Sequence, residues 1–461
     1  MPGSVSLLFA CHSSIALRWQ WHTIAFFTAF LLIFSGTTCT FKPPLTTLDM
    51  SCEDCECKKA TTTPTPCTKT KKKRRNRRRN EVPDSIKNDP QLLKASSVLP
   101  SNYNLEVPKT IHRIRERKAK LVGVQFPEGL LCYATIICDI LETFTGCETL
   151  IMAEVTYGAC CVDDLGAAAV GCDLLVHYGH SCLVPISHTT VEVMYVFVTI
   201  DIDLAHLIGC VQLTFPNKNI RLALMGTIQF TPTILKAAQV LQKKLGYSIV
   251  TTPQAKPLSK TEVLGCTSPK LFDTDAFVFV ADGRFHLESA MIHNPSVLSY
   301  QYNPYNKIMT QEFYETPKML ATRQTAIAKA KDQTKWGIIL GTLGRQGNVK
   351  ILERLKKAMD DAGKKYFVLL LSEIFPSKLA LFTEVGAWVQ IACPRLSIDW
   401  GRAFERAPLL NPYEAHVALD KTTFKSTYPM DFYAKGSGPW TNYYDDSSAS
   451  SSGEKSSSKK V

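Results

Sequence analysis

The 461-residue sequence lacks long apolar runs, apart from one near its start. A membrane-spanning helix needs roughly 18 or more consecutive apolar residues, and only the stretch around Ile24 to Phe34 approaches that length. The sequence is therefore not that of a multi-span membrane protein. Most of the chain also lacks an excess of one charge. The net charge is +12, but nine positively charged residues lie between Lys69 and Arg79. The rest of the chain is therefore nearly balanced in charge, and we expect no specific nucleic-acid partner for the folded part.

The chain also lacks the dense cysteine spacing of a small secreted domain. Its 16 cysteines are spread over 461 residues, whereas disulfide frameworks are typical of chains under about 100 residues. Many of the later cysteines interrupt apolar runs, which is typical of small buried side chains. We expect packing roles for five of them: Cys132, Cys138, Cys147, Cys172 and Cys210.

The two ends of the chain do not have the pattern of folded domains. Residues 1–85 are predicted to be a largely disordered extension, which carries the short apolar run, the spaced cysteines Cys52, Cys55 and Cys57, and the basic run. The apolar run fits a signal-peptide core or a short anchor, and the basic run fits nuclear targeting or contact with a polyanion. Residues 436–461 are rich in Ser and Lys and are predicted to be a disordered tail.

The region between these ends repeats one pattern three times. An apolar run enters a turn at Gly123, Gly226 and Gly341, and each turn is followed by apolar residues at helical spacing. Two further apolar runs follow each helix. The pattern predicts an α/β fold of three tandem Rossmann-like β-α-β-α-β domains with parallel sheets. We place these domains at residues 86–200, 201–310 and 311–435.

Each predicted domain carries cysteine in a loop that follows a strand. These loops contain the pair Cys160 and Cys161, then Cys266, then Cys393. Ligands of open parallel sheets bind at the carboxyl ends of the strands, so the three loops could share one metal site. Cys182 is a rival, because it follows the third strand of its domain as Cys393 does. The spacing does not choose between Cys160 and Cys161.

The same loops carry long motifs that resemble the catalytic subunits of eukaryotic diphthamide synthase, the 2-(3-amino-3-carboxypropyl)histidine synthase family. The resemblance covers about residues 86 to 435. The matching stretches are VQFPEGLL (124–131), TYGACCVDD (156–164), LLVHYGHSCLVP (174–185), GCTSP (265–269), DGRFHLES (282–289), GTLGRQGN (341–348), LLLSEIFPSKL (369–379) and ACPRLSIDWG (392–401).

This resemblance implies a [4Fe–4S] cluster held by Cys160, Cys266 and Cys393, with the three domains in a pseudo-three-fold arrangement around it. Thiolates are the usual protein ligands of such clusters, and three of them leave one iron free. The family uses that iron to hold S-adenosylmethionine. Its radical chemistry transfers the 3-amino-3-carboxypropyl group to imidazole C2 of a histidine in translation elongation factor 2. The sequence lacks the C-x3-C-x2-C motif of other radical enzymes that use this donor.

Polar residues of the same loops are predicted to contact the cofactor or the donor. They are Gln125, Glu128, Asp282, Arg284, Arg345, Gln346 and Arg395. An arginine there could pair with the carboxylate of the donor. Each of them could instead cap a loop or form a salt bridge between domains. His177, His180 and His286 could be ligands or proton donors, but histidines beside strands are more often structural, hydrogen-bonded residues. No catalytic residue is assigned.

The resemblance further implies a heterodimer with a second synthase subunit and a small metal-binding protein as electron donor. We expect a cytoplasmic location, because a secreted route would oxidise the thiols, although the two N-terminal runs leave membrane or nuclear targeting open. Three alternatives stay open: a quinolinate-synthase-like [4Fe–4S] lyase, a non-catalytic partner subunit of the synthase, and a nucleic-acid-binding module that uses the basic run.

Overall fold

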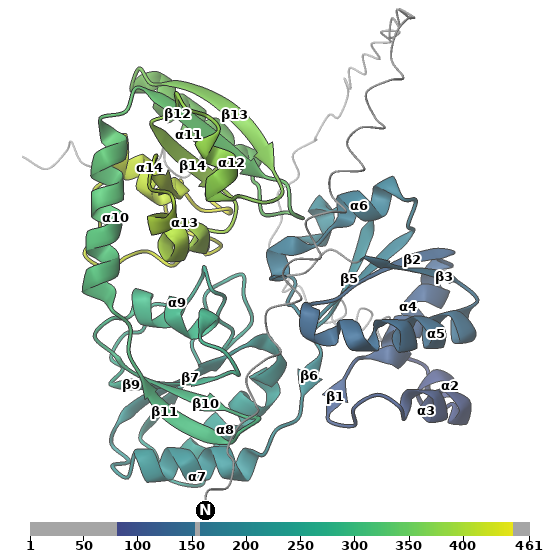
Figure 1. Ribbon diagram of the computed structural model, residues 1–461. Coiled ribbons are helices and arrows are strands. Elements are labelled where there is room, and N and C mark those ends of the chain that lie inside the picture. Colours follow the sequence, from purple (N-terminus) through teal and green to yellow (C-terminus); the bar gives the residue numbers. More distant parts are fainter. Residues whose placement is uncertain (1–80, 153–156, 446–461) are drawn as a thin grey trace, which may run out of the picture. The chain divides into compact units, whose positions relative to one another are not determined.

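The computed structural model describes residues 81–152 and 157–445 (Figure 1). The apolar run, the spaced cysteines Cys52, Cys55 and Cys57, and the basic run lie outside the described residues, as does the tail after residue 445. Within the described ranges, no helix combines the length and the apolar character needed to cross a membrane.

The first sheet has four parallel strands in the order β3-β2-β4-β5. These strands are β2 (Leu121–Gln125), β3 (Glu148–Met152), β4 (Leu174–Tyr178) and β5 (Glu192–Val196). Helix α5 (Ala134–Thr145) joins β2 to β3 and ends at Gly146, whose φ of +70° favours glycine. A 3₁₀ turn, η2 (Ala159–Cys161), and helix α6 (Asp164–Ala169) lie between β3 and β4.

Short elements precede and flank this sheet. They are α2 (Asp84–Lys87), α3 (Pro90–Ser96), β1 (Tyr103–Asn104), α4 (Val107–Arg117), the 3₁₀ turns η1 (Glu128–Tyr133) and η3 (Ile186–His188), and β6 (Thr199–Ile200). Strands β1 and β6 pair with each other in antiparallel register. The start of the predicted first helix, around Leu130, is the turn η1 rather than α-helix.

The second sheet has five strands in the order β11-β10-β9-β7-β8, and only β11 is antiparallel to its neighbour. Its strands are β7 (Arg221–Gly226), β8 (Ile249–Thr251), β9 (Ala276–Val280), β10 (Leu298–Asn303) and β11 (Ile308–Glu312). Its helical elements are α7 (Leu204–Thr214), η4 (Ile228–Phe230), α8 (Thr231–Lys243) and α9 (Phe285–His293). The predicted helix between β8 and β9 is wrong, because irregular chain held by isolated bridges joins them.

The third sheet again has four parallel strands, in the order β13-β12-β14-β15. Its strands are β12 (Lys335–Gly341), β13 (Lys365–Leu371), β14 (Ala387–Ile391) and β15 (Leu409–Leu410). Its helical elements are α10 (Thr316–Lys331), α11 (Val349–Asp361), α12 (Pro376–Ala380), α13 (Arg395–Trp400), η5 (Gly401–Ala403) and α14 (Pro412–Ala418).

The three sheets share one strand order, in which the first strand lies between the second and the third and a fourth strand follows. Every residue of β4, β9 and β14 is buried, because helices cover both faces of these central strands. The predicted α/β class with parallel sheets is confirmed. The fourth strands were not predicted. The Rossmann-like assignment and the pseudo-three-fold arrangement stay predictions.

The chain after α14 packs against parts of the fold that lie far apart in sequence. Ser268 donates its backbone N–H to the carbonyl of Met430 at 2.9 Å, and the Nδ2 of Asn348 donates to the side-chain oxygen of Asn442 at 3.0 Å. Trp440 is only 3% exposed. The prediction of a disordered tail from residue 436 is therefore wrong as far as Tyr443, whose hydroxyl donates to the carbonyl of Leu183.

Candidate functional site

The three cysteines predicted as ligands follow strands in the structure. Cys160 lies in the turn η2 after β3, Cys266 lies in the irregular chain between β8 and β9, and Cys393 comes two residues after the end of β14. Each loop contains a Gly or Pro beside the cysteine. Cys393 thus lies at the carboxyl end of its strand, whereas Cys160 and Cys266 lie farther along the chain that follows β3 and β8.

All three thiols line one cavity of about 480 Å³. We call it the cysteine cavity. Cys266 is 9% exposed, and Cys160 and Cys393 are half-buried. The rest of its wall includes Phe285 and His286 at the start of α9, Leu343 and Gln346 in the turn after β12, and Ser372–Phe375 after β13. Residues more than 100 positions apart in sequence therefore meet at one hollow.

Burial controls the protonation of these thiols. It raises the pKa of Cys266 to about 12 and the pKa of Cys393 to about 11. The pKa of Cys160 is also raised, chiefly through its hydrogen bond with the Cys161 thiol. The same hydrogen bond lowers the pKa of Cys161 to about 7. A metal that binds the Cys266 and Cys393 thiols would have to displace their protons.

The cysteine cavity does not have the geometry of a site for a single ion. Among the described residues, no three His, Cys, Asp or Glu side chains converge closely enough to hold one metal ion.

The neighbouring Cys161 does not line this cavity, although its thiol is hydrogen-bonded to that of Cys160. It is 1% exposed. Its Sγ accepts a hydrogen bond from Nε2 of Gln346 at 3.3 Å, and its carbonyl accepts one from Nε2 of Gln125 at 3.0 Å. Of the two adjacent cysteines, Cys160 is the one whose thiol reaches the cavity.

Two predicted site residues brace the Cys160 loop instead of lining the cavity. Gln125 accepts hydrogen bonds from the backbone of Asp163 at 3.2 Å and shares one with Nδ1 of His177 at 2.9 Å. Arg345 binds the buried carboxylate of Asp164 through Nε at 2.7 Å and Nη2 at 2.6 Å. The backbone N–H of Arg345 also donates to the carbonyl of Cys160 at 2.8 Å.

The turn that carries Arg345 fits the Cys160 loop only because Gly344 lacks a side chain. Gly344 has a φ of +54°, and a Cβ there would lie 2.5 Å from the carbonyl carbon of Cys161. Non-bonded carbon atoms prefer separations of about 3.5–4.0 Å. The glycine is therefore required both by its backbone conformation and by the close approach of two chain segments.

Arg395 lines the cysteine cavity, but its hydrogen-bond donors already have partners. Its Nε donates to the Asp399 carboxylate at 2.8 and 2.9 Å, its Nη1 donates to the carbonyl of Phe285 at 2.6 Å, and its Nη2 pairs with Glu288. The guanidinium also lies 4.4 Å from the centroid of the Phe285 ring. This arginine joins the second and third sheets and forms part of the wall.

The other predicted contact residues lie elsewhere. Gln346 lines the cavity, whereas Glu128, Asp282 and Arg284 are exposed and do not. Arg284 pairs with Glu312 and Glu288. The rival Cys182 donates to the carbonyl of Val184 and lines a different pocket.

The expectation for the packing cysteines is confirmed for three and wrong for one. Cys138, Cys147 and Cys172 are buried, Cys210 is half-buried, and Cys132 is exposed. Cys132 lies in the turn η1, where the predicted helix has not yet begun, so its side chain does not face the core.

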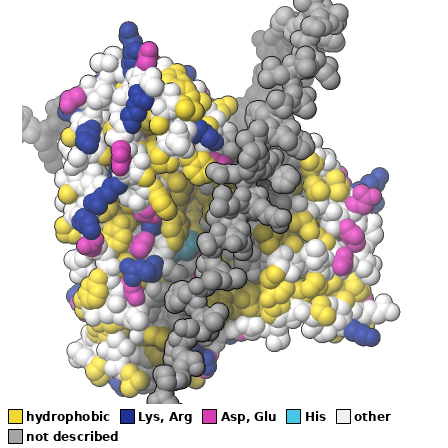
Figure 2. All heavy atoms as spheres, viewed as in Figure 1, with side chains coloured by type: hydrophobic (Ala, Val, Ile, Leu, Met, Phe, Trp, Pro, Cys, Tyr) yellow, Lys and Arg dark blue, Asp and Glu magenta, His cyan; other side chains and the backbone are white. Residues whose placement is uncertain are grey.

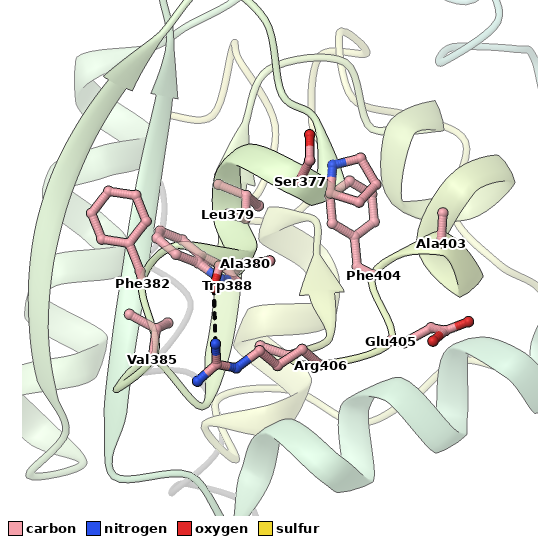
Figure 3. A pocket seen from close by; sticks show the side chains of 12 residues that line it. Ser377, Leu379, Ala380, Phe382, Val385, Trp388, Ala403, Phe404, Glu405 and Arg406 are labelled. Atoms are coloured by element: carbon pink, nitrogen blue, oxygen red, sulfur yellow. Dashed lines mark hydrogen bonds between the residues drawn. The ribbon is translucent and has the colours of Figure 1, made fainter.

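A separate pocket of about 290 Å³ lies beside α12 in the third sheet's part of the chain (Figure 3). Phe382, Val385 and Trp388 form its apolar wall, and Nη1 of Arg406 donates to the carbonyl of Ala380 at 2.8 Å. Its lining contains no cysteine or histidine. It therefore lacks the ligand chemistry of the cysteine cavity.

Comparisons with known proteins identify the family. The family described as "Putative diphthamide synthesis protein" matches residues 126–429. The chain is 56% identical over 366 residues to 2-(3-amino-3-carboxypropyl)histidine synthase subunit 1 of Bos taurus, covering 78% of this chain and 82% of that relative. The human protein of the same name gives the same identity and coverage. The chain belongs to the diphthamide synthesis family.

This family member also shares its fold with a solved structure, "Crystal structure of Dph2 from Pyrococcus horikoshii with 4Fe-4S cluster". The TM-score is 0.61 at 24% identity, and the alignment covers 73% of this chain and 95% of that one. A more distant relative from Dictyostelium discoideum, again named subunit 1, is 51% identical over 372 residues, which is 79% of this chain and 78% of the relative. The family resemblance read from the sequence is confirmed, and it places the chain among transferase subunits of diphthamide synthesis.

Some cavity residues were not assigned from the sequence. Leu183, Phe285, Ser372, Glu373 and Trp400 all line the cavity, and all lie inside motifs that carry the family resemblance. The family motifs therefore already included these cavity residues, although their residue types alone did not indicate a role in a site. Leucine and phenylalanine in a loop are more often packing residues than parts of a site.

Proposed function

We propose that this chain transfers the 3-amino-3-carboxypropyl group of S-adenosylmethionine to imidazole C2 of a histidine in translation elongation factor 2, the first step of diphthamide synthesis. In this proposal a [4Fe–4S] cluster bound by Cys160, Cys266 and Cys393 drives the reaction. The observation that carries the proposal is that three thiols from distant loops line one cavity.

The donor set of the cavity suits such a cluster. Thiolates are the usual cluster ligands and four is the usual count, so three cysteines leave one iron for the donor molecule. Cys161 is turned toward Gln346 and does not line the cavity. The similar structure of Dph2 from Pyrococcus horikoshii was solved with a 4Fe-4S cluster. When bound, the cluster would supply the electron that cleaves a sulfur–carbon bond of S-adenosylmethionine.

The chain's own residues would hold the cysteine loops in place and shield the reacting groups from water. Gln125 and Arg345 fix the position of the Cys160 loop, and Arg395 ties the wall near Cys266 to the wall near Cys393. Apolar and aromatic side chains form much of the remaining wall, which limits the access of water to a reactive intermediate. In this proposal the three sheets are Rossmann-like units with pseudo-three-fold symmetry around the cluster.

The partners and the location are also part of the proposal. The name "subunit 1" of the relatives implies a complex of several subunits. We propose a heterodimer with a second synthase subunit, elongation factor 2 as the protein substrate, and a small metal-binding protein as electron donor. We propose a cytoplasmic location, because the cavity thiols must stay reduced and the protein substrate is a translation factor. The comparisons favour this synthase over a quinolinate-synthase-like lyase.

The cluster is tested by anaerobic purification followed by analysis of iron, sulfide and the electron paramagnetic resonance spectrum. We expect about four irons per chain in the wild type and loss of the cluster in Cys160→Ser, Cys266→Ser and Cys393→Ser. Cys172→Ser is the matched control, because Cys172 is also buried but does not line the cavity. Full iron content in Cys266→Ser or Cys393→Ser would show that the ligand set is wrong.

Two further measurements separate the remaining alternatives. Cys161→Ser should keep the cluster, and if it loses iron while Cys160→Ser retains it, Cys161 is the ligand. Transfer of radiolabel from carboxyl-labelled S-adenosylmethionine to elongation factor 2, in the presence of a reductant and the second subunit, tests the reaction. A chain that binds the cluster but never labels the factor would instead be a non-catalytic subunit.

A further inference from the structure

Glu262 is a fully buried carboxylate without a cationic partner. It is 0% exposed, and its Oε2 accepts the backbone N–H of Ser259 at 2.9 Å. Its Oε1 has no hydrogen-bond partner, and within the described chain no Lys or Arg forms an ion pair with it. An unpaired buried carboxylate is costly, so such groups usually face a cation, a metal or a polar ligand.

Three more polar side chains near Glu262 also have unpartnered buried atoms. They are His180, Ser181 and His286, through Nδ1, Oγ and Nδ1 respectively. The Ser181 hydroxyl is close enough to lower the pKa of Glu262, although burial has the larger and opposite effect. Burial lowers the pKa of His180 and of His286 to about 4, and the charge of His180 further lowers that of His286. Both rings are partly exposed, whereas their Nδ1 atoms are buried.

We call these four residues the polar recess; Glu262, Ser181 and His180 do not themselves line the cysteine cavity. His286 belongs to both, because it lines the cavity wall. Leu183 lies two residues after Ser181, and Leu264 lies two residues after Glu262, and both also line the wall. The recess therefore lies between the first and second sheets' parts of the chain, at the edge of the space that holds the thiols.

The recess is rich in hydrogen-bond acceptors. A carboxylate accepts only, a neutral imidazole nitrogen without hydrogen accepts, and a hydroxyl can do either. An ammonium group carries three N–H donors and a positive charge, so it matches this set. Resting on the proposed function, we propose that Glu262, Ser181, His180 and His286 bind the ammonium group of the donor's aminocarboxypropyl chain.

Calorimetric titration of the iron-loaded full chain under anaerobic conditions tests this assignment. The two probes are S-adenosylmethionine and 5′-methylthioadenosine, which lacks the aminocarboxypropyl chain. We expect Glu262→Gln and His286→Asn to weaken binding of S-adenosylmethionine about 10- to 100-fold, as for loss of a hydrogen bond to a charged group. Binding of 5′-methylthioadenosine should stay unchanged.

His416→Asn is the matched control. His416 is also buried, both its ring nitrogens lack partners and burial lowers its pKa to about 4, but it lies on α14 and does not line the cavity. This variant should bind both probes as the wild type does. Iron content and the paramagnetic resonance spectrum, measured on every variant, show whether the site itself is intact.

The outcomes separate this inference from the proposed function. If the wild type binds S-adenosylmethionine and both Glu262→Gln and His286→Asn bind it equally well with iron intact, the recess does not hold the ammonium group. Equal weakening of both probes would also overturn the inference, since it would show a general disturbance. If the wild type with its full iron content does not bind S-adenosylmethionine, the proposed function fails instead.

Discussion

Replacing Gly344 with alanine should release iron from the protein without unfolding it. Gly344 has a φ of +54°, a conformation that costs a residue with a Cβ about 1–2 kcal/mol. The larger effect is steric, because the added Cβ would lie 2.5 Å from the carbonyl carbon of Cys161 and 2.6 Å from its Cα. Backbone cannot move aside as a side chain can, so one of the two loops must shift by about 1 Å to restore contact distance.

That shift would be transmitted to the thiol. The backbone N–H of Arg345 donates to the carbonyl of Cys160 at 2.8 Å. If the turn around Gly344 shifts, it must either pull the Cys160 loop with it or break this hydrogen bond. Either movement displaces Cys160 from Cys266 and Cys393. We therefore expect iron per chain to fall to less than half of the wild-type value.

Gly363→Ala provides the matched control. Gly363 follows α11 with a φ of +63°, so alanine there meets the same backbone strain, but nothing lies within 4 Å of its Cβ position. We expect Gly363→Ala to lower the melting temperature by a few degrees, as for a change of about 1 kcal/mol, and to keep all of its iron. Wild-type iron content and an unchanged paramagnetic resonance spectrum in Gly344→Ala would refute the reasoning.

Other expected outcomes concern stability and the mouth of the cavity. Arg345 holds the pKa of the buried Asp164 carboxyl below its usual range, although burial opposes this. The ion pair therefore stabilises the fold above about pH 4, and that contribution is lost as the pH falls through the lowered pKa, so melting curves between pH 5 and pH 2 should fall less steeply in Asp164→Asn. Arg323→Met leaves the buried Glu414 unpaired and should cost about 3–5 kcal/mol in urea unfolding, and a loss under 1 kcal/mol would contradict this. Trp400 is 65% exposed at the cavity wall, so Trp400→Ala should raise KM for the protein substrate with unchanged iron, and an unaltered KM would count against a docking role.

The stability of the Arg323–Glu414 pair depends on more than charge. Nε of Arg323 donates to Glu414 at 2.6 Å and Nη2 donates at 2.7 Å, while the hydroxyl of Tyr428 donates to the same carboxylate at 2.8 Å. Glu414 also completes a capping box with Asn411 at the start of α14. This network fixes the last helix and the chain after it, which packs beside Cys266.

Hydrophobic side chains form patches on the face drawn in Figure 2. Tyr157 and Phe375 are, like Trp400, both exposed and part of the cavity wall, at 70% and 49% exposure. Exposed aromatic side chains around a cavity are typical of surfaces that bind another protein. In the proposed function, such a surface would receive the chain segment that presents the target histidine.

Sequence alone determined the class of fold and the position of the cysteines relative to the strands. The apolar runs 174–178, 276–280 and 387–391 form strands in which every residue is buried. A continuous apolar run is typical of a strand covered on both faces, so its alternation with helical patterns predicts parallel sheets. It also placed a thiol after a strand in each sheet. These features depend on local periodicity, which each segment carries in itself.

Tertiary structure decided what each loop residue contacts. Arg345 meets Asp164 across 181 residues, and Gly344 meets Cys161, because two loops from different sheets pack together. The packing of Gly344 against Cys161 also decides that Cys160, and not Cys161, lines the cavity. The polar recess around Glu262 likewise depends on how the first and second sheets' parts of the chain pack together. Local pattern specifies which side chains are buried, but which distant partner each one meets is set by how the sheets pack, and no single segment of sequence contains that information.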